Sequence, residues 1–312
     1  MQTTDQVLMI RPARFISNPQ TAASNAFQHQ QENACQAQAS ALQEFDAYVD
    51  ALLGAGVGVT VIEDTPLPHT PDSIFPNNWI SCHADGRVFV YPMEAVNRRQ
   101  ERRAAVLDKI AQSFNIREVI DLGHFEIGAL YLEGTGSMVL DHEHQLAYIC
   151  HSSRSHPAVM QEFMRYTGYR AIWFHAHDKH GLAIYHTNVM MCIGKGLAVI
   201  CAEAISDTTE RDVVCATLTA SGKQIITISQ NQMAAFAGNM LELKSSDGKA
   251  VFVMSRQAWV ALTAHQQEII SAGASVVLAP IENIERLGGG SARCMLAEIF
   301  LPRRAASVCL AE

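Results

Sequence analysis

The feature that most constrains this chain is an internal repeat of one small structural unit. Four stretches are typical of β-hairpins, because each joins two apolar, β-branched runs through a polar or glycine-containing turn. These stretches are Trp79–Met93, Ser137–His151, Val189–Ile205 and Leu241–Ser255. Their turns lie near residues 86, 143, 195 and 248, so successive turns are 57, 52 and 53 residues apart. Such a regular period predicts one supersecondary unit repeated along the chain.

Two further elements follow each hairpin. An amphipathic segment with helical spacing comes first, and a short apolar strand follows it. Ser206-Asp207 and Ser255 stand where two of the helices need N-capping side chains. The expected helices are Asn97–Phe114, His156–Tyr166, Thr208–Ser221 and Arg256–Ala272, and the expected strands are Glu118–Leu122, Ala171–Phe174, Gln224–Ile228 and Ser275–Leu278. The repeated unit is therefore ββαβ.

A fifth unit can be assembled from the two ends of the chain. Cys294–Pro302 and Val7–Pro12 can pair as its hairpin, Asn33–Leu53 is its helix and Val57–Ile62 its last strand. Five units with a split closing unit predict a closed ring, an α/β fold of the five-bladed, pseudo-symmetric α/β-propeller type, in one domain over residues 1–312. An open α/β sheet of two domains is the alternative. It would not require a hairpin in every unit, and no Pro/Ser-rich linker marks a boundary.

Composition excludes several classes of protein. The net charge of −8 and the sequence pI of about 5.9 argue against nucleic-acid binding, which usually needs a basic stripe. No apolar run reaches the ~18–20 residues that span a bilayer, and the N-terminal segment lacks a secretory pattern, so we expect a cytoplasmic protein without a membrane partner. The eight cysteines form no C-x-x-C pair, so no zinc ribbon is indicated.

The repeat brings chemically useful residues together. Residues just before each hairpin should occupy equivalent positions and converge on the pseudo-five-fold axis. The converging positions are Asp72 with Asn77-Asn78, Glu133, His186-Thr187-Asn188, Phe236–Asn239 and Cys294. A cysteine, a histidine and a glutamate in one cavity suit nucleophilic catalysis by a thiolate with general acid–base assistance.

The same motifs resemble a known superfamily. The P-D-S-x-F segment, E-G-T, H-T-N and a glycine-rich loop before a late cysteine are similar to the guanidino-group modifying enzymes. These comprise arginine deiminase, dimethylarginine dimethylaminohydrolase and the amidinotransferases, all five-bladed α/β propellers, and the chain is most similar to the branch with citrulline-utilisation hydrolases. The resemblance implies that Cys294 is the nucleophile, His186 the general acid/base, and Glu133 the carboxylate that orients the histidine and the substrate nitrogens.

Two positions depart from the deiminase pattern. Where a deiminase carries two aspartates that bind the guanidinium, this chain carries Asn78 and Asn188. Neutral amides would forfeit two charge-assisted hydrogen bonds to a guanidinium but can both donate to and accept from a ureido group. We therefore expect citrulline as substrate, hydrolysed at its ureido C–N bond. The alternative substrates are arginine, dimethylarginine or an amidino donor. Either Asn77 or Asn78 could align with the first aspartate, because the two asparagines are adjacent.

The amino-acid end of such a substrate needs counter-charges. Arg154 and Arg98 each resemble an arginine of the family, and the arginine that Arg98 resembles binds the α-carboxylate. Asp72 would contact the α-ammonium group. Arginine suits a carboxylate because its planar fork can donate two parallel hydrogen bonds. For Arg98 the alternative is a solvated helix face shared with Arg99 and the arginines at 102 and 103.

Other motifs have weaker interpretations. His175, His177 and His180 could ligate a metal, but the cysteine chemistry needs none, so a substrate-gating loop or a solvated segment is favoured, and we expect no metal and no cofactor. Gly288–Gly290 is not a P-loop and suggests a mobile loop that carries Cys294. We expect a small-molecule amino-acid substrate, and the sequence leaves open a homo-oligomer and a non-enzymatic binding relative.

Overall fold

The chain folds into five small three-stranded sheets. The computed structural model describes residues 1–22, 25, 27–29 and 34–304. The sheet orders are β15-β1-β2, β3-β4-β5, β6-β7-β8, β9-β10-β11 and β12-β13-β14. The strands are β1 (Gln6–Arg11), β2 (Gly58–Glu63), β3 (Ile80–Cys82), β4 (Arg87–Val90), β5 (Glu118–Asp121), β6 (Met138–Asp141), β7 (Leu146–Cys150), β8 (Arg170–Phe174), β9 (Met191–Ile193), β10 (Leu197–Ile200), β11 (Gln224–Thr227), β12 (Leu241–Lys244), β13 (Ala250–Ser255), β14 (Ala274–Ala279) and β15 (Ala297–Glu298).

Every sheet has the same internal pattern. Its middle strand pairs antiparallel with one neighbour and parallel with the other. In four sheets the antiparallel pair is a hairpin, and the parallel strand returns after a crossover that contains a helix, as parallel pairing requires. In the fifth sheet, β15 from the end of the chain pairs with β1 from its beginning, with Val7 opposite Glu298. The ββαβ repeat and the split fifth unit are confirmed.

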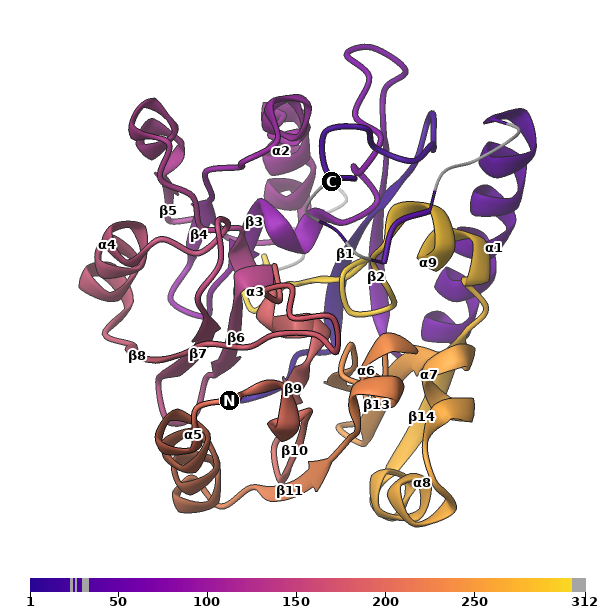
Figure 1. Cartoon of the computed structure of the whole chain (residues 1–312). Helices are drawn as coiled ribbons and strands as arrows, with labels where there is room; N and C mark the ends of the chain where they lie inside the picture. Colours follow the sequence, from indigo (N-terminus) through magenta and orange to yellow (C-terminus); the bar gives the residue numbers. More distant parts are fainter. Residues whose placement is uncertain (23–24, 26, 30–33, 305–312) are drawn as a thin grey trace, which may run out of the picture.

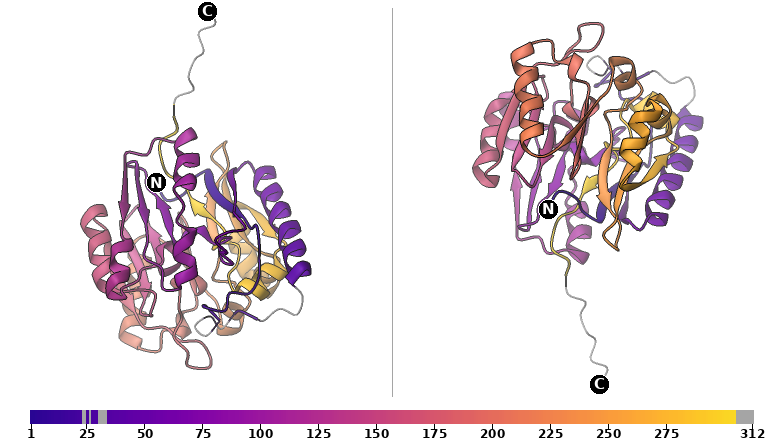
Figure 2. Two further views of the ribbon diagram at one scale, coloured as in Figure 1. Left: turned by 90° about the horizontal axis from the view of Figure 1, so that it is seen from above. Right: turned by 90° about the horizontal axis from the view of Figure 1, so that it is seen from below.

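The helices of the crossovers lie around the outside of these sheets (Figures 1 and 2). The α-helices are α1 (Ala34–Gly54), α2 (Ala104–Ser113), α3 (Gly134–Ser137), α4 (Pro157–Thr167), α5 (Thr208–Ala220), α6 (Gln230–Ala234), α7 (Arg256–Ala261), α8 (Ala264–Ser271) and α9 (Glu282–Gly288). Short 3-10 turns cover Pro76–Asn78, Val96–Glu101, Gly123–Gly128, Thr187–Val189 and Ala202–Ala204. Asn33, the expected first residue of α1, lies outside the described residues.

Two expected helices are divided in the structure. The segment 97–114 begins as a 3-10 turn and becomes the helix α2 only after Arg102, whose ψ of 72° is not helical. The segment 256–272 is interrupted at Leu262, and Thr263 then caps α8 by accepting a hydrogen bond from the Gln266 backbone N–H. Local capping and burial therefore override the amphipathic pattern that suggested continuous helices.

The residues that precede the first strand of each sheet form tight turns, and these turns position the site. Pro76–Asn78 precedes β3, α3 precedes β6 and Thr187–Val189 precedes β9. The helix α3 contacts both 3-10 turns, so three units meet there. The fourth such segment contains Phe236, whose φ of +60° is unusual for a side chain of this size.

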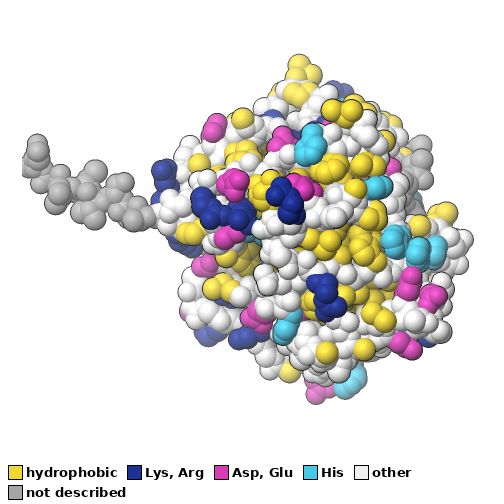
Figure 3. Space-filling model, turned by 90° about the vertical axis from the view of Figure 1, so that its left-hand side faces the viewer, with side chains coloured by type: hydrophobic (Ala, Val, Ile, Leu, Met, Phe, Trp, Pro, Cys, Tyr) yellow, Lys and Arg dark blue, Asp and Glu magenta, His cyan; other side chains and the backbone are white. Residues whose placement is uncertain are grey.

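Charged side chains are interspersed on the face that carries α4 and α5, where Lys and Arg lie among Asp and Glu (Figure 3). Arg165 pairs with Glu162 and His175 with Glu210 in this region. Among the residues that the structure describes, no helix is long and apolar enough to cross a membrane.

Candidate active site

A small cavity of about 20 Å³ collects most of the residues expected to carry chemistry. Six of the eight predicted residues line it, namely Asp72, Asn78, Arg98, Arg154, His186 and Cys294. The other two lie directly behind its wall: Glu133 contacts His186, and Asn188 contacts Cys294. The structure therefore brings all eight together: the converging positions expected from the period, and Arg98 and Arg154, which the resemblance implied.

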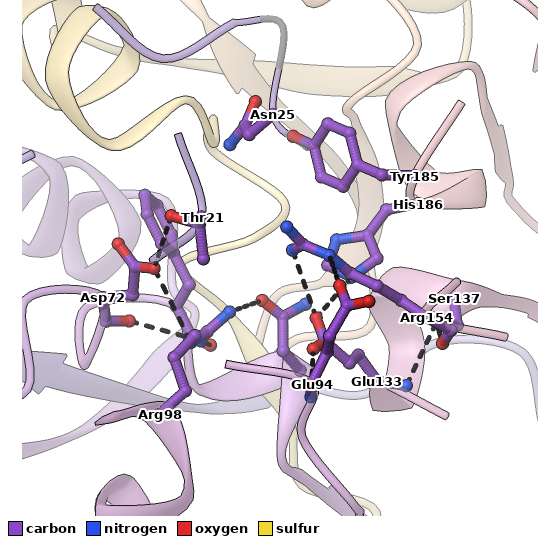
Figure 4. A network of polar contacts seen from close by, with 12 residues as sticks. Thr21, Asn25, Asp72, Glu94, Arg98, Glu133, Ser137, Arg154, Tyr185 and His186 are labelled. Carbon is purple, nitrogen blue, oxygen red and sulfur yellow. Dashed lines mark hydrogen bonds and ion pairs between the residues drawn. The ribbon is translucent and has the colours of Figure 1, made fainter. Parts of the chain in front are cut away.

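Glu133 holds the histidine in place. Nε2 of His186 lies 2.8 Å from Oε2 of Glu133, and Nη1 of Arg154 donates to the same oxygen at 3.3 Å (Figure 4). Arg154 also pairs through Nε with Glu94 at 3.2 Å, and its guanidinium lies 4.9 Å from the centre of the Tyr185 ring. Glu133, His186 and Arg154 are all buried. Such a network fixes the imidazole, because each partner is held by another.

The charge states of this pair follow from burial and from the neighbouring arginine. Burial opposes ionisation of Glu133, but Arg154 and His186 together outweigh it, so the pKa of Glu133 lies well below its ordinary value. Burial lowers the pKa of His186 to about 4, although the Glu133 carboxylate opposes this shift. At neutral pH an ionised carboxylate thus accepts the Nε2 proton of a neutral imidazole, which leaves Nδ1 as a proton acceptor.

Two amides surround the sulfur of Cys294. Nδ2 of Asn239 lies 3.2 Å and Nδ2 of Asn188 3.5 Å from Sγ. Asn188 was expected to contact substrate; its amide contacts the sulfur, and the residue lines a second cavity of about 20 Å³ together with Gln2 and His142. The thiol itself is 5% exposed and opens into the first cavity.

Arg98 is an interior residue, so the alternative of a solvated helix face is wrong. Its exposure is 2%, and its Nε and Nη2 donate to the two oxygens of Glu101 at 2.9 and 3.0 Å. Its Nη1 donates to Oδ1 of Asn78 at 2.7 Å. Most of the guanidinium fork is therefore engaged by the protein, and the remaining donor directions are limited.

Asp72 closes the same end of the cavity. Its Oδ2 accepts a hydrogen bond from Nδ2 of Asn18 at 2.7 Å and lies 3.8 Å from Nε of Arg98. Its Oδ1 is buried and has no hydrogen-bond partner among the described residues. Burial raises the pKa of Asp72, while Arg98 and Asn18 oppose the shift. A buried carboxylate oxygen that lacks a partner favours a positively charged group beside it.

Close packing explains the glycines at this site. A Cβ on Gly136 would overlap the Asn78 amide nitrogen and lie 2.9 Å from Nδ1 of His186, so the missing side chain lets these two groups approach. A Cβ on Gly288 or Gly290 would lie 2.8 to 2.9 Å from the Phe75 ring. The segment 288–290 is thus the buried end of α9, with Gly289 at φ +66°, and it is packed rather than loose.

Two other features do not join this site. Among the described residues no group of three or more His, Cys, Asp or Glu side chains could hold a metal, and His175 instead contacts Glu210 at 2.9 Å. A larger cavity of about 540 Å³ is lined by Phe27, His180, Phe236 and others, but it contains none of the eight predicted residues. We therefore place the chemistry in the smaller cavity, where the titratable groups converge.

Sequence reasoning missed several side chains that shape the site. Asn239 lay at the end of a converging segment but received no role, and Tyr185 directly precedes His186. Glu101 lies three residues after Arg98, a spacing that places two residues on one side of a helical turn and could have indicated the pair. Glu94 had no local signal, because its contact with Arg154 joins distant segments.

The chain matches a protein family over most of its length. The family model described as N,N dimethylarginine dimethylhydrolase, eukaryotic, matches residues 11–301. The chain therefore belongs to this family and, with it, to the guanidino-group modifying, amidinotransferase-like superfamily. The resemblance inferred from the motifs is confirmed. No curated protein sequence matches the chain.

Solved structures share the fold. The N-terminal domain of ArgZ, an arginine dihydrolase from the ornithine-ammonia cycle in Cyanobacteria, has a TM-score of 0.73 at 16% identity, covering 95% of this chain and 98% of that one. Unliganded AgrE has a TM-score of 0.74 at 17% identity, covering 96% of this chain and 40% of that one. DDAH from Pseudomonas aeruginosa has a TM-score of 0.64 at 14% identity, covering 96% and 100%.

Membership in the superfamily defines the class of activity. The homologous members of the matched family are C–N bond hydrolases of this superfamily that use a cysteine nucleophile, and the chain is an enzyme of this class. The alternative of a non-enzymatic binding relative is therefore set aside.

Proposed function

We propose that this enzyme hydrolyses the ureido C–N bond of citrulline to give ornithine, ammonia and carbon dioxide. The observation that carries the proposal is the hydrogen bond from Nη1 of Arg98 to Oδ1 of Asn78, at 2.7 Å. A guanidinium can only donate, so the atom of Asn78 that faces Arg98 must be the oxygen. Nδ2 of Asn78 is therefore the amide atom turned away from Arg98. Asn78 lines the cavity, and its Nδ2 has no hydrogen-bond partner among the described residues.

We assign the unpartnered Nδ2 of Asn78, which lies against Gly136, to the substrate, where its N–H would discriminate between the two substrate classes. The oxygen of a ureido group accepts a hydrogen bond from it, whereas every nitrogen of a guanidinium is a donor. A guanidinium beside Asn78 would place two donors against each other and leave a buried polar group unpaired, which is costly. Asn77, the other candidate in the alignment, does not line the cavity.

Cys294, His186 and Glu133 are assigned the chemical steps. The Cys294 thiol gives its proton to His186, and the thiolate attacks the ureido carbon to form a C–S bond. His186 then protonates the departing nitrogen, so ammonia leaves and a thiocarbamate of ornithine remains on the sulfur. Water activated by His186 attacks this carbon, the C–S bond breaks, and the released carbamate decomposes to ornithine and carbon dioxide. Glu133 keeps the imidazole oriented throughout.

The remaining charges suit the amino-acid end of the substrate. Asp72 has a buried oxygen available for the α-ammonium group, and Arg154 and Arg98 supply positive charge at the cavity wall for the α-carboxylate. Because Glu101 already binds two nitrogens of Arg98, we assign that arginine chiefly to orienting Asn78.

The cavity must enlarge when substrate binds. About 20 Å³ is near the space of one water molecule, far below the ~300 Å³ or more of typical ligand sites. The wall is closed where the Tyr185 hydroxyl and Nδ2 of Asn25 both donate to the Gly289 carbonyl, at 2.8 and 3.2 Å. Displacement of the Tyr185 and Asn25 side chains from Gly289 would open the site.

A guanidino substrate is the second candidate. ArgZ is described as an arginine dihydrolase, and one of its variants was captured covalently bound to a reaction intermediate. DDAH from Pseudomonas aeruginosa was solved with citrulline bound. Incubating the pure protein separately with citrulline, arginine and dimethylarginine, and measuring ornithine, citrulline and ammonia, separates the candidates. Ornithine from citrulline supports the proposal; conversion of arginine to citrulline, with citrulline left intact, overturns it.

We also propose that the five sheets form one closed propeller domain. Neighbouring first strands support this, since β15 contacts β3, β6 contacts β9 and β9 contacts β12. The backbone N–H of Lys244 donates to the Thr4 carbonyl and so links the last hairpin to the N-terminal segment. Equilibrium unfolding should show one transition by both tryptophan fluorescence and circular dichroism; separate transitions would contradict a single domain.

A further inference from the structure

Asn239 lies at the sulfur of Cys294 and is held from several sides. The residue is fully buried, and its Oδ1 accepts a hydrogen bond from the backbone N–H of Arg293 at 3.0 Å. Its Nδ2 donates to the Asn188 carbonyl at 2.8 Å and lies 3.2 Å from Sγ of Cys294. Because a backbone N–H can only donate, the Arg293 contact determines which end of the amide is oxygen. The nitrogen therefore faces the sulfur.

We infer that Asn239 is a catalytic residue, whose amide N–H stabilises the thiolate of Cys294. The inference rests on the proposed function, in which Cys294 is the nucleophile. One hydrogen of Nδ2 satisfies the Asn188 carbonyl and the other is directed to Sγ. When the sulfur is protonated, its hydrogen has an acceptor in Oδ1 of the same amide, 3.6 Å away. One side chain thus serves both protonation states.

Burial makes this contact important. A thiolate that is 5% exposed has lost most of its hydration, and only hydrogen-bond donors or positive charges compensate for that loss. The neighbouring Arg293 guanidinium is directed elsewhere, donating to the Leu296 carbonyl and to Glu298 at 2.7 and 3.0 Å. The titratable side chains that line the cavity with Cys294 are Asp72, Arg98, Arg154, Tyr185 and His186, and Tyr48 interacts with it electrostatically.

The backbone around Asn239 is also unusually constrained. A Cβ on Gly238 would lie 2.7 Å from the carbonyl carbon of Met190, so the segment is pressed against the end of the turn that carries Asn188. Phe236, three residues earlier, has a φ of +60°. Backbone strain of this kind persists where the surrounding structure imposes it, and it is concentrated at functional sites. The amide is therefore held in position before substrate binds.

Two substitutions test the role. Asn239→Asp keeps an oxygen for the Arg293 N–H but replaces the donor with a carboxylate oxygen, and Asn239→Ala removes both. Asn115→Ala, at an exposed loop, is the matched control. Alkylation of Cys294 by iodoacetamide without substrate is followed by peptide mass spectrometry as a function of pH. Loss of a hydrogen bond to a charged group should move the midpoint of the profile upward by about one pH unit or more in both variants, and not in the control.

Kinetics provide a second readout. Because Asn239 does not line the cavity, kcat for citrulline should fall by roughly tenfold or more while KM changes little. A covalent substrate adduct trapped on a cysteine other than Cys294 would overturn the assigned nucleophile itself. Alkylation of Cys294 with an unchanged pH profile in Asn239→Asp, or in Asn239→Ala should the aspartate variant fail to fold, would overturn only the role of Asn239.

Discussion

The substitution Asn78→Asp addresses substrate choice at a single atom. Arg98 donates to Oδ1 of Asn78, so the change leaves that contact in place and exchanges the unpartnered Nδ2 for a carboxylate oxygen. The new carboxylate remains next to the Arg98 guanidinium, which stabilises its charge. We therefore expect the variant to fold and to differ from the parent mainly in which groups it can bind.

The magnitude follows from the hydrogen bonds exchanged. For citrulline, a donor to the ureido oxygen is lost and an acceptor faces an acceptor, at a cost of about 1–3 kcal/mol. For arginine, a charge-assisted hydrogen bond of about 1.5–3 kcal/mol is gained and the donor–donor conflict disappears. Added together, these terms shift the ratio of the two kcat/KM values toward arginine by roughly 10²–10⁴-fold, since 1.4 kcal/mol is a factor of ten.

The assay measures ornithine from citrulline, and citrulline and ammonia from arginine, with both substrates on both proteins. Where arginine turnover is below detection, competitive inhibition of citrulline hydrolysis by arginine supplies the affinity. Asn77→Asp is the matched control, because Asn77 is equally buried and adjacent but does not line the cavity. It should lower stability, through a buried charge, without changing the substrate ratio.

A substrate ratio that is unchanged in a folded Asn78→Asp protein would refute the reasoning. So would a change of the same size in Asn77→Asp, because selectivity would then not depend on the atom held by Arg98. Efficient arginine turnover by the unmodified protein would show that the amide N–H does not exclude a guanidinium.

The other predictions concern the nucleophile, metals and acid. Cys294→Ala should abolish turnover, whereas Cys192→Ala, at a core position that does not line the site cavity, should lower the unfolding midpoint and leave the chemical steps intact; a covalent substrate adduct isolated on any cysteine other than Cys294 would contradict this. Prolonged chelation should leave activity unchanged, and activity restored by added zinc or manganese would contradict a metal-free mechanism. Stability should fall as pH drops from 6.5 toward 4, because unfolding raises the pKa of His186 from about 4 to its ordinary 6.5, so the unfolded chain binds the proton first. Protonation of Glu133, whose pKa is lowered in the folded state, adds to the loss of stability at lower pH. If acid denaturation is the same in His186→Asn and in the parent protein, the assignment of this pH dependence to His186 is contradicted.

The fold could be predicted from the sequence because its unit is repeated. Hairpin turns such as Asp85-Gly86 and Asp247-Gly248 are local signals. Because four such turns recur at a regular spacing, each predicted hairpin is better supported than it would be alone. The helix boundaries were less predictable. The break at Leu262 depends on Thr263 capping a new helix, and the break at Arg102 accompanies burial of the preceding turn, neither of which an apolar period contains.

The identities of the site residues could be predicted, but not all of their contacts. The repeat places Cys294, His186 and Glu133 on one axis, and the structure brings them together. The repeat does not specify whether a side chain at that axis faces the cavity or lies behind its wall. Asn188 was expected to contact the substrate; its Nδ2 lies 3.5 Å from the Cys294 sulfur, a contact that the repeat does not specify.

Arg98 shows why the substrate cannot be inferred from the asparagines alone. An asparagine presents a donor at one end of its amide and an acceptor at the other, so Asn78 by itself is compatible with either orientation. Its orientation is set by a buried arginine that is in turn held by both oxygens of Glu101. Replacing Glu101 would free the guanidinium to turn away, and the amide of Asn78 could then rotate to offer its oxygen to the substrate. Under the proposed function, selectivity for a ureido group would therefore depend on the Glu101–Arg98–Asn78 chain of contacts, and a related sequence with the same asparagine but without this ion pair would not be expected to share it.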